Sequence, residues 1–314
     1  MPLLVLGSTN LDHVHRVVRI PAPGETVLAR DSRAFPGGKG LNQAVAAART
    51  EPGTAFVTSL GRDAAGDELA GVLGNEPLTL HARRGDLRTG TAHITVDERG
   101  ENAIVVDSGA NTALLRLTAE EKSLVAAADA LLLQLEIPLA SVTEAARTAR
   151  AAGTVSILNA APIRPLPAEL LDALDVLIVN EHEARELASD CGIAAQSDDA
   201  LAAALTALVP LVLVTLGSDG VVVAIRGREP ARAPAFRVEA VDTTGAGDTF
   251  CGAFAARLAA TGVRHDDPEP LRALVRWASA AAAISVTRHG AAVSAPTAAE
   301  TEAFLAERAD DRVR

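Results

Sequence analysis

A glycine-rich turn followed by a carboxylate is the part of this sequence best suited to chemistry. It reads Val-Asp-Thr-Thr-Gly-Ala-Gly-Asp-Thr-Phe over residues 241–250 and leads into an alanine-rich helical pattern. Gly245 and Gly247 leave backbone amides bare at a helix start, where unsatisfied N–H groups and the helix dipole favour an anion. Asp248 stands in the first helical turn, as a base that could accept a hydroxyl proton. The arrangement fits phosphoryl transfer to an alcohol, although the same residues also suit a plain turn with an N-capping carboxylate.

A second glycine-rich segment favours the chemical interpretation. Asn10 and Asp12 follow the first apolar stretch, and Gly37-Gly38-Lys39-Gly40 leads into another helical pattern. Fixed polar side chains and bare amides suit a sugar, whose buried hydroxyls must each be paired. Lys39 and Lys122 are the only lysines among 29 basic residues, which favours a role for a compact ammonium at position 39. Chance retention of that lysine is the alternative.

The remaining composition narrows the class of protein. The 314 residues are 48% hydrophobic and carry a net charge of −11, which allows a large core and disfavours nucleic acid or an anionic membrane as partner. We expect a cytoplasmic protein, because no long apolar run and no basic leader segment occur. Cys191 and Cys251 suggest neither a disulfide framework nor a zinc site. The glycine patterns of Rossmann dehydrogenases and P-loop enzymes are missing.

Strand and helix patterns alternate along most of the chain. Short apolar segments predict buried strands at 3–7, 55–59, 130–133, 155–158, 176–179, 211–215 and 221–225. Amphipathic segments predict helices at 40–49, from about 65, and at 139–151, 181–188, 198–208, 246–260, 270–286 and 298–308. This alternation indicates an α/β fold, a doubly wound, mostly parallel sheet flanked by helices. We expect a single domain over residues 1–309 and a disordered tail over 310–314.

Two pairs of segments do not fit this repeat. Residues 12–20 with 26–35, and 91–96 with 102–106, have the pattern of hairpins. We expect them to form a small antiparallel β-sheet, from about residues 11–36 and 90–108, that acts as a lid over the ligand-binding strand ends. One apolar face of such a sheet stays uncovered within one subunit, which predicts a homodimer through the lid sheets.

Further motifs run in order along nearly the whole chain. They are Gly7-Ser8-Thr9-Asn10-Leu11-Asp12, Pro23-Gly24-Glu25-Thr26-Val27, Asn42-Gln43-Ala44-Val45-Ala46-Ala47, Gly109-Ala110-Asn111, Gln134-Leu135-Glu136, Asn159-Ala160-Ala161-Pro162, Asn180-Glu181-His182-Glu183, Thr215-Leu216-Gly217-Ser218-Asp219-Gly220 and Thr287-Arg288-His289-Gly290. Together with the two glycine-rich signatures, they resemble the ribokinase-like (PfkB) family of carbohydrate kinases. The resemblance implies ATP-dependent phosphorylation of D-ribose at O5, giving D-ribose 5-phosphate and ADP.

The resemblance also implies roles for individual residues. Asp248 would be the catalytic base, and the amides of Gly245, Ala246 and Gly247 would form the anion hole. The sugar would be held by Asn10, Asp12, Gly38, Lys39, Gly40, Asn42, Glu136 and Asp248. The nucleotide would be bound by Asn180, Thr215, Leu216, Gly217, Ser218, Gly220, Gly247 and Ser279.

Two cations are implied as cofactors besides ATP. Glu183 would organise Mg²⁺ indirectly, together with phosphate. A monovalent cation, usually K⁺, would lie beside the anion hole in a shell formed, in part through backbone carbonyls, by Asp242, Thr244, Ser285, Arg288, Gly290 and Ser294. His182 and His289 are expected to be surface or hydrogen-bonded residues.

Two departures from the family pattern leave nucleotide preference open. Ser279 stands where a bacterial member of the family has a histidine, and the connection over residues 259–270 is longer than usual. The nearest alternative functions are related kinases acting on deoxyribose, fructose or a nucleoside. A non-catalytic sugar-binding regulator is a more distant alternative, because both Asp248 and the glycine amides are retained.

Overall fold

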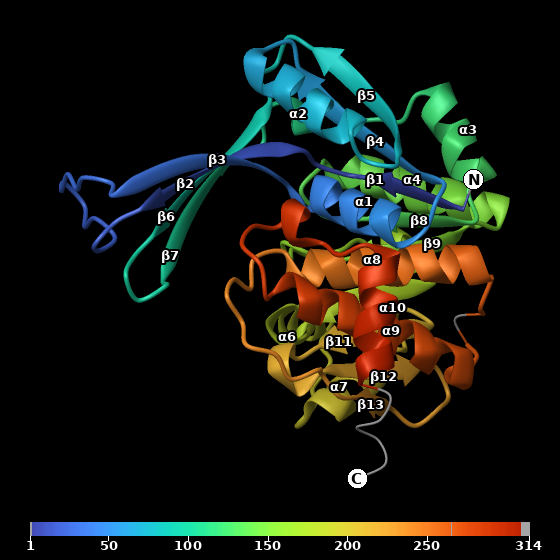
Figure 1. Ribbon diagram of the computed structural model, residues 1–314. Coiled ribbons are helices and arrows are strands. Elements are labelled where there is room, and N and C mark those ends of the chain that lie inside the picture. The colour runs from blue at the N-terminus through green and yellow to red at the C-terminus, as the bar shows by residue number, and fades with distance from the viewer. Residues whose placement is uncertain (1, 265, 309–314) are drawn as a thin grey trace.

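Nine strands form one large sheet in the computed structural model, which describes residues 2–264 and 266–308 (Figure 1). In sheet order the strands are β13 (Ala231–Ala233), β12 (Val221–Ile225), β11 (Leu211–Thr215), β10 (Val176–Asn180), β9 (Val155–Asn159), β8 (Ala130–Leu133), β1 (Leu3–Leu6), β4 (Thr54–Gly61) and β5 (Thr79–Gly85). The strands from β11 to β5 are all parallel, whereas β12 pairs antiparallel with both β11 and β13. The predicted α/β fold is therefore confirmed, while the tail over 310–314 lies outside the described residues.

Helices cover both faces of this sheet, which explains why its central strands are apolar throughout. Side chains alternate between faces, so Leu3 and Val5 enter one hydrophobic cluster and Leu4 and Leu6 the other. The first face is covered by α1 (Lys39–Thr50), α2 (Ala64–Gly74), α8 (Ala246–Thr261), α9 (Pro268–Ser285) and α10 (Ala298–Glu307). The second is covered by α3 (Ala119–Ala127), α4 (Leu139–Ala152), α5 (Ala168–Leu171), α6 (Glu181–Asp190) and α7 (Asp198–Leu205). Among the described helices, none combines the length and the apolar character needed to cross a membrane.

A second sheet of four strands projects from one edge of the molecule (Figure 1). Its order is β3 (Asp31–Gly37), β2 (Asn10–Arg16), β6 (Gly90–Val96) and β7 (Asn102–Asp107). The two hairpins, β2–β3 and β6–β7, are antiparallel as predicted. They join through a parallel pair, β2 with β6, which the sequence analysis did not anticipate. All six residues of β7 are exposed.

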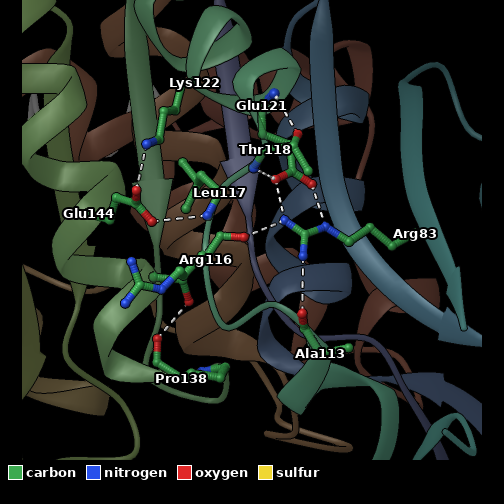
Figure 2. A network of polar contacts seen from close by, with 10 residues as sticks. Arg83, Ala113, Arg116, Leu117, Thr118, Glu121, Lys122, Pro138 and Glu144 are labelled. Atoms are coloured by element: carbon green, nitrogen blue, oxygen red, sulfur yellow. Dashed lines mark hydrogen bonds and ion pairs between the residues drawn. The ribbon is translucent and has the colours of Figure 1, made fainter.

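The strand β5 and the helix α3 are among the elements that were not predicted, because their sequences lack a clear apolar period. The edge strand β5 carries charged Arg83 among half-buried residues, and α3 begins at a capping box between Thr118 and Glu121. Arg83 connects the two: it forms two hydrogen bonds to Glu121 and donates to the carbonyl oxygens of Ala113 at 3.0 Å and Arg116 at 2.6 Å (Figure 2). Its guanidinium thus holds the segment that precedes α3 against the sheet.

Candidate active site

Helices α1 and α8 cross closely and bring the two glycine-rich segments together. Gly252 makes the crossing possible, because a Cβ at this position would lie 2.3 Å from the carbonyl oxygen of Gln43. At the crossing, Asn42 Nδ2 donates to Asp248 Oδ2 at 3.0 Å, and Gln43 Nε2 donates to Asp248 Oδ1 at 2.9 Å. Both oxygens of the proposed base are therefore oriented from α1.

A small cavity of about 150 Å³ opens beside Asp248. Eight of the predicted site residues line it: Lys39, Asn180, Glu183, Thr215, Gly245, Ala246, Gly247 and Asp248. Five further residues complete the lining, namely Asn159, Ala161, Ile178, Thr243 and Cys251. Two wider and more open clefts, of about 700 and 760 Å³, adjoin α4 and α5 and contain none of the predicted site residues. We therefore take the smaller cavity as the candidate active site, on the chemistry of its lining.

The glycine turn before α8 has the geometry of an anion site. Gly245 has a φ of 76° and is the N-cap of α8. A Cβ there would lie 2.8 Å from Ala291 Cα, so only glycine fits the position. Among the described residues, the N–H groups of Gly247 and Asp248 make no hydrogen bond. These groups can bind the oxygens of a phosphoryl group at a helix N-terminus.

The part of the site that was predicted to hold the sugar contains buried acceptors that lack a partner. Asp12 Oδ1 and Asn42 Oδ1 are buried and make no hydrogen bond to any described residue. Burial, followed by repulsion from Glu136 and Asp248, raises the pKa of Asp12 to about 7. Buried polar atoms of this kind normally have partners, so they point to a ligand with hydroxyl groups.

Glu136 connects the segment before β2 to the start of α1 through hydrogen bonds. Its Oε2 accepts from Ser8 Oγ at 2.6 Å and from the backbone N–H of Lys39 at 2.8 Å, and Ser8 Oγ accepts from the N–H of Gly40 at 3.1 Å. Gly38 is the N-cap of α1 with a φ of 86°, and a Cβ at Gly40 would lie 2.4 Å from Ser8 N. Glu136 Oε1 makes no hydrogen bond within the described part of the chain, which leaves it for a ligand.

The Lys39 side chain lines the cavity beside Asp248, in addition to lying near the residues predicted to bind the sugar. It makes no ion pair within 4.0 Å in the described ranges, although Asp248, Glu136 and Glu183 surround it. Attraction from Asp248 is the main reason that the pKa of Lys39 is raised. A charged ammonium beside the bare amides is suited to phosphate oxygens.

The residues predicted to bind nucleotide lie in three places. Asn180, Thr215 and Gly247 line the cavity, whereas Leu216, Gly217, Ser218 and Gly220 form the turn after β11 outside it. In that turn Gly220 has a φ of 94°, and a Cβ would lie 2.1 Å from the carbonyl oxygen of Ala233. Ser279 lies within α9, and its buried Oγ has no partner among the described residues.

Asn180 and Glu183 form a capping box at the start of α6. Glu183 N–H donates to Asn180 Oδ1, and Asn180 N–H donates to Glu183 Oε2, both at 2.8 Å. Burial is the main reason that the pKa of Glu183 is raised. The cap fixes both side chains at the cavity wall, where Glu183 supplies a carboxylate.

Asp242 joins the two segments predicted to form the potassium shell. Its carboxylate accepts from the backbone N–H of Thr244 at 2.9 Å and from that of Gly290 at 3.0 Å. Burial opposes ionisation of Asp242, but these hydrogen bonds prevail and lower its pKa. A Cβ at Gly245 would lie 2.8 Å from Ala291 Cα, so the joined segments lie directly beside the glycine turn.

The other residues of this shell could contribute mainly backbone oxygens. The hydroxyls of Ser285 and Ser294 donate to the carbonyls of Ala282 and Ala291, and the Arg288 side chain donates to Glu300 at 2.6 Å. No group of three or more His, Cys, Asp or Glu that could hold a metal occurs in the residues that the structure describes.

Several polar residues at the site had no role predicted from the sequence. Gln134 Nε2 donates to Gln43 Oε1 at 2.7 Å, and Gln43 Nε2 donates to Asn159 Oδ1 at 3.0 Å as well as to Asp248. Gln134 follows β8 and Asn159 ends β9, where ligands bind in open parallel sheets. Their position after a strand was the signal that could have identified them. His182 and His289 are exposed, in accord with the sequence analysis.

Comparison with known proteins now decides the family. The sequence pattern of the pfkB family of carbohydrate kinases matches residues 2–298. The chain belongs to this family. Among pfkB kinases, the ribokinase of Haemophilus influenzae is 39% identical over 308 residues, which cover 96% of this chain and 98% of the relative.

Solved structures of pfkB kinases agree with the fold. The ribokinase structure of Thermotoga maritima has a TM-score of 0.87 and 38% identity, over 97% of this chain and 99% of that one. The Arabidopsis thaliana ribokinase complexed with ribose and ATP has a TM-score of 0.86 and 33% identity, over 97% and 98% of the two chains. The resemblance inferred from the motifs is thus confirmed, and the protein is an ATP-dependent carbohydrate kinase.

Proposed function

We propose that this protein is a ribokinase, which transfers the γ-phosphoryl group of ATP to O5 of D-ribose and releases D-ribose 5-phosphate and ADP. One observation carries the proposal: Asp248 lies at a cavity with the free N–H groups in the first turn of α8, and it accepts a hydrogen bond from Asn42 in the first turns of α1. Ribokinases similar over almost the whole chain support ribose as the substrate. We place the reaction in the cytoplasm, where ATP is available.

The sugar would lie between the start of β2, the start of α1 and Asp248. The unpartnered Asp12 Oδ1, Asn42 Oδ1 and Glu136 Oε1 are acceptors matched to hydroxyl donors. Pairing each buried hydroxyl gives selectivity, because a missing partner is costly. We assign ribose binding to Asn10, Asp12, Gly38, Lys39, Gly40, Asn42, Glu136 and Asp248.

Asp248 would act as the general base. Asn42 and Gln43 each donate to one of its oxygens, and each oxygen keeps a further lone pair for the O5 proton. As O5 bonds to the γ-phosphorus, its proton passes to Asp248 and the bond from phosphorus to the ADP oxygen breaks. The free N–H groups of Gly247 and Asp248 and the Lys39 ammonium would stabilise the charge on the transferred oxygens, together with Gly245 and with Ala246, whose N–H would exchange its 3.3 Å bond to the Thr243 carbonyl for the ligand.

The nucleotide would bind along the carboxyl ends of β10 and β11. Asn180 and Thr215 end these strands at the cavity wall, and the glycine turn after β11 leads outward from it. Backbone amides of such a turn can approach a ligand closely. We assign ATP binding to Asn180, Thr215, Leu216, Gly217, Ser218, Gly220, Gly247 and Ser279.

Mg²⁺ and K⁺ are the proposed cofactors. Glu183 offers a carboxylate in the cavity wall, which suits indirect binding of Mg²⁺ beside phosphate. The carboxylate of Asp242 and nearby hydroxyl and carbonyl oxygens are hard donors that suit K⁺. We assign the K⁺ shell to Asp242, Thr244, Ser285, Arg288, Gly290 and Ser294. When bound, these cations would neutralise charge around the phosphoryl group.

The four-stranded sheet is proposed to act as a lid and to pair with that of a second copy. Ile104, Val105 and Val106 on its edge strand β7 are 52%, 69% and 51% exposed. An exposed apolar edge strand is a liability unless something covers it. A homodimer through the lid sheets would cover this surface.

The test of this function is ADP release measured with D-ribose, 2-deoxyribose, fructose and a nucleoside under the same conditions. We expect the highest kcat/KM with D-ribose. A higher kcat/KM with another substrate would assign the protein to a neighbouring specificity of the family. Binding of D-ribose without ADP release would instead indicate a sugar-binding regulator.

A further inference from the structure

Asn111 is a buried amide that contacts the sugar-binding segment without facing the cavity. It lies in the 3-10 helix η1 (Gly109–Ala113) and is 1% exposed. The backbone N–H of Thr9 donates to Asn111 Oδ1 at 2.9 Å. Because a backbone N–H can only donate, this contact determines which end of the Asn111 amide is the oxygen. The Nδ2 group is then the donor, and it also donates to the carbonyl oxygen of Thr9 at 3.3 Å.

The orientation of the Asn111 amide determines the orientation of the Asn10 amide. Asn111 Nδ2 donates to Asn10 Oδ1 at 2.8 Å, so the Asn10 oxygen is already bound and its Nδ2 faces away. In the described parts of the chain, Asn10 Nδ2 makes no hydrogen bond, although the residue is only 3% exposed. Because the nitrogen atom itself is not fully buried, an oxygen of a bound sugar can reach it and accept a hydrogen bond from it.

We propose that Asn111 is a positioning residue, which holds Asn10 as a hydrogen-bond donor toward the substrate. Asn10 then donates a hydrogen bond to the oxygen of one sugar hydroxyl. Asp12, Asn42 and Glu136 instead accept hydrogen bonds from sugar hydroxyls. The inference rests on the proposed function, because it takes Asn10 as a sugar-binding residue.

The surroundings leave this contact little freedom. Gly90 pairs with Asn10 in the lid sheet, and a Cβ at Gly90 would lie 2.3 Å from Asn10 Oδ1 and 2.4 Å from Asn111 Nδ2. Arg83 holds the chain just beyond Asn111 through the carbonyls of Ala113 and Arg116 (Figure 2). The hydrogen bonds from Thr9 to Asn111 and from Asn111 to Asn10 therefore lie between the main body and the base of the lid.

The experiment is a double-mutant cycle on the KM for D-ribose. Asn111→Asp keeps an acceptor for the Thr9 N–H but sets a carboxylate oxygen against Asn10 Oδ1, so the Asn10 amide must turn over. Asn111→Ala removes the contact altogether. Each is combined with Asn10→Ala, and KM, kcat and melting temperature are measured. The control is Thr112→Ala in the same helix, whose exposed hydroxyl donates only to the carbonyl oxygen of Gly109.

We expect each Asn111 variant to raise the KM about ten- to hundredfold, as for loss of one buried hydrogen bond, with kcat within about threefold of wild type. In the Asn10→Ala background, the same Asn111 substitutions should raise the KM for D-ribose by less than about twofold. Additive effects on KM would overturn the inference, as would an unchanged KM in the single variants. If Asn111→Asp does not fold, Asn111→Ala provides the cycle. Absence of ribose phosphorylation by the wild type would instead reject the proposed function.

Discussion

Asn42 and Asp248, 206 positions apart in the chain, are joined by a hydrogen bond of 3.0 Å between Asn42 Nδ2 and Asp248 Oδ2. Asn42 stands in the first turns of α1, directly after the lid strand β3, and Asp248 stands in the first turn of α8, after the glycine turn. A single contact therefore couples the segment proposed to hold the sugar to the group proposed to remove its proton.

Replacing Asp248 by Asn tests the general base. The amide retains the size of the carboxylate but cannot accept a proton from O5, so we expect kcat to fall by about 10²- to 10⁴-fold with little change in the KM for D-ribose. Steady-state ADP release measures both constants. The control is Glu302→Gln, which removes an exposed carboxylate of α10 that does not line the cavity. A kcat near that of wild type in the Asp248 variant would remove Asp248 from the mechanism.

Gln43→Leu tests the amide that orients the base. The change removes the donor to Asp248 Oδ1 and leaves Gln134 Nε2 without its acceptor. We expect kcat to fall about tenfold or more, and the free energy of unfolding to fall by about 1–3 kcal/mol, because a buried amide becomes unpaired. Kinetics and urea denaturation measure the two effects. Loss of stability with an unchanged kcat would make Gln43 a purely structural residue.

The main sheet and the glycine turn were predictable because local sequence determines them. The strands β1 and β8 are apolar on both faces, and Gly245 precedes a helix with an acid in its first turn. The strand β5 was missed because charged residues such as Arg83 occupy a half-buried edge. The parallel pairing of β2 with β6 was missed because no local pattern specifies contacts between distant hairpins.

The amide network was not predictable for a related reason. Gln43 meets Gln134 and Asn159 across 91 and 116 positions of sequence. Uncharged amides follow no spacing rule of the kind that marks metal ligands or helix caps, so their contacts emerge only when α1, β8 and β9 are assembled. Asn111, which lies outside every predicted role, became visible in the same way.

The raised pKa of Asp12 predicts a pH-dependent stability. Its pKa is about 7 in the folded protein, against an ordinary value of 3.8. Between these pH values the folded chain keeps a proton on Asp12 that the unfolded chain releases. The contribution of Asp12 to the free energy of unfolding is therefore fully present below pH 3.8 and is lost as the pH rises through about 7. Asp12→Asn cannot titrate. We expect the free energy of unfolding of wild type, relative to this variant, to fall by up to about 1.4 kcal/mol per pH unit between about pH 5 and 7.

Urea denaturation of both proteins without sugar, at several pH values from about 5 to 8, measures this difference. Carboxyl groups other than Asp12 titrate in both proteins and largely cancel in the comparison. Parallel stability curves for the two proteins would show that Asp12 has no raised pKa.

The segments joined by Asp242 predict activation by a monovalent cation. Asp242→Ala frees the N–H groups of Thr244 and Gly290, so the two segments lose their common partner. We expect wild type to turn over faster in potassium chloride than in sodium chloride at equal ionic strength, and the variant to lose this difference. Glu300→Gln, which weakens the Arg288 side-chain contact, is the control that should retain it. Equal wild-type rates in both salts would contradict the proposed shell.

The exposed apolar edge of the small sheet predicts a homodimer, which one charged substitution on β7 should dissociate. Ile104 and Val106 lie on the same face of β7 and are each about half exposed. Ile104→Asp places a carboxylate in the apolar contact proposed between two lids, where burial of an unpaired charge is strongly unfavourable. We expect wild type to be a dimer at micromolar concentration, and the variant to be a monomer with a higher KM for D-ribose, because its lid loses support. Light scattering with size-exclusion chromatography measures the mass, and Leu115→Asp, an exposed leucine outside the small sheet, should remain dimeric. A wild-type protein that is monomeric at these concentrations would exclude the lid interface.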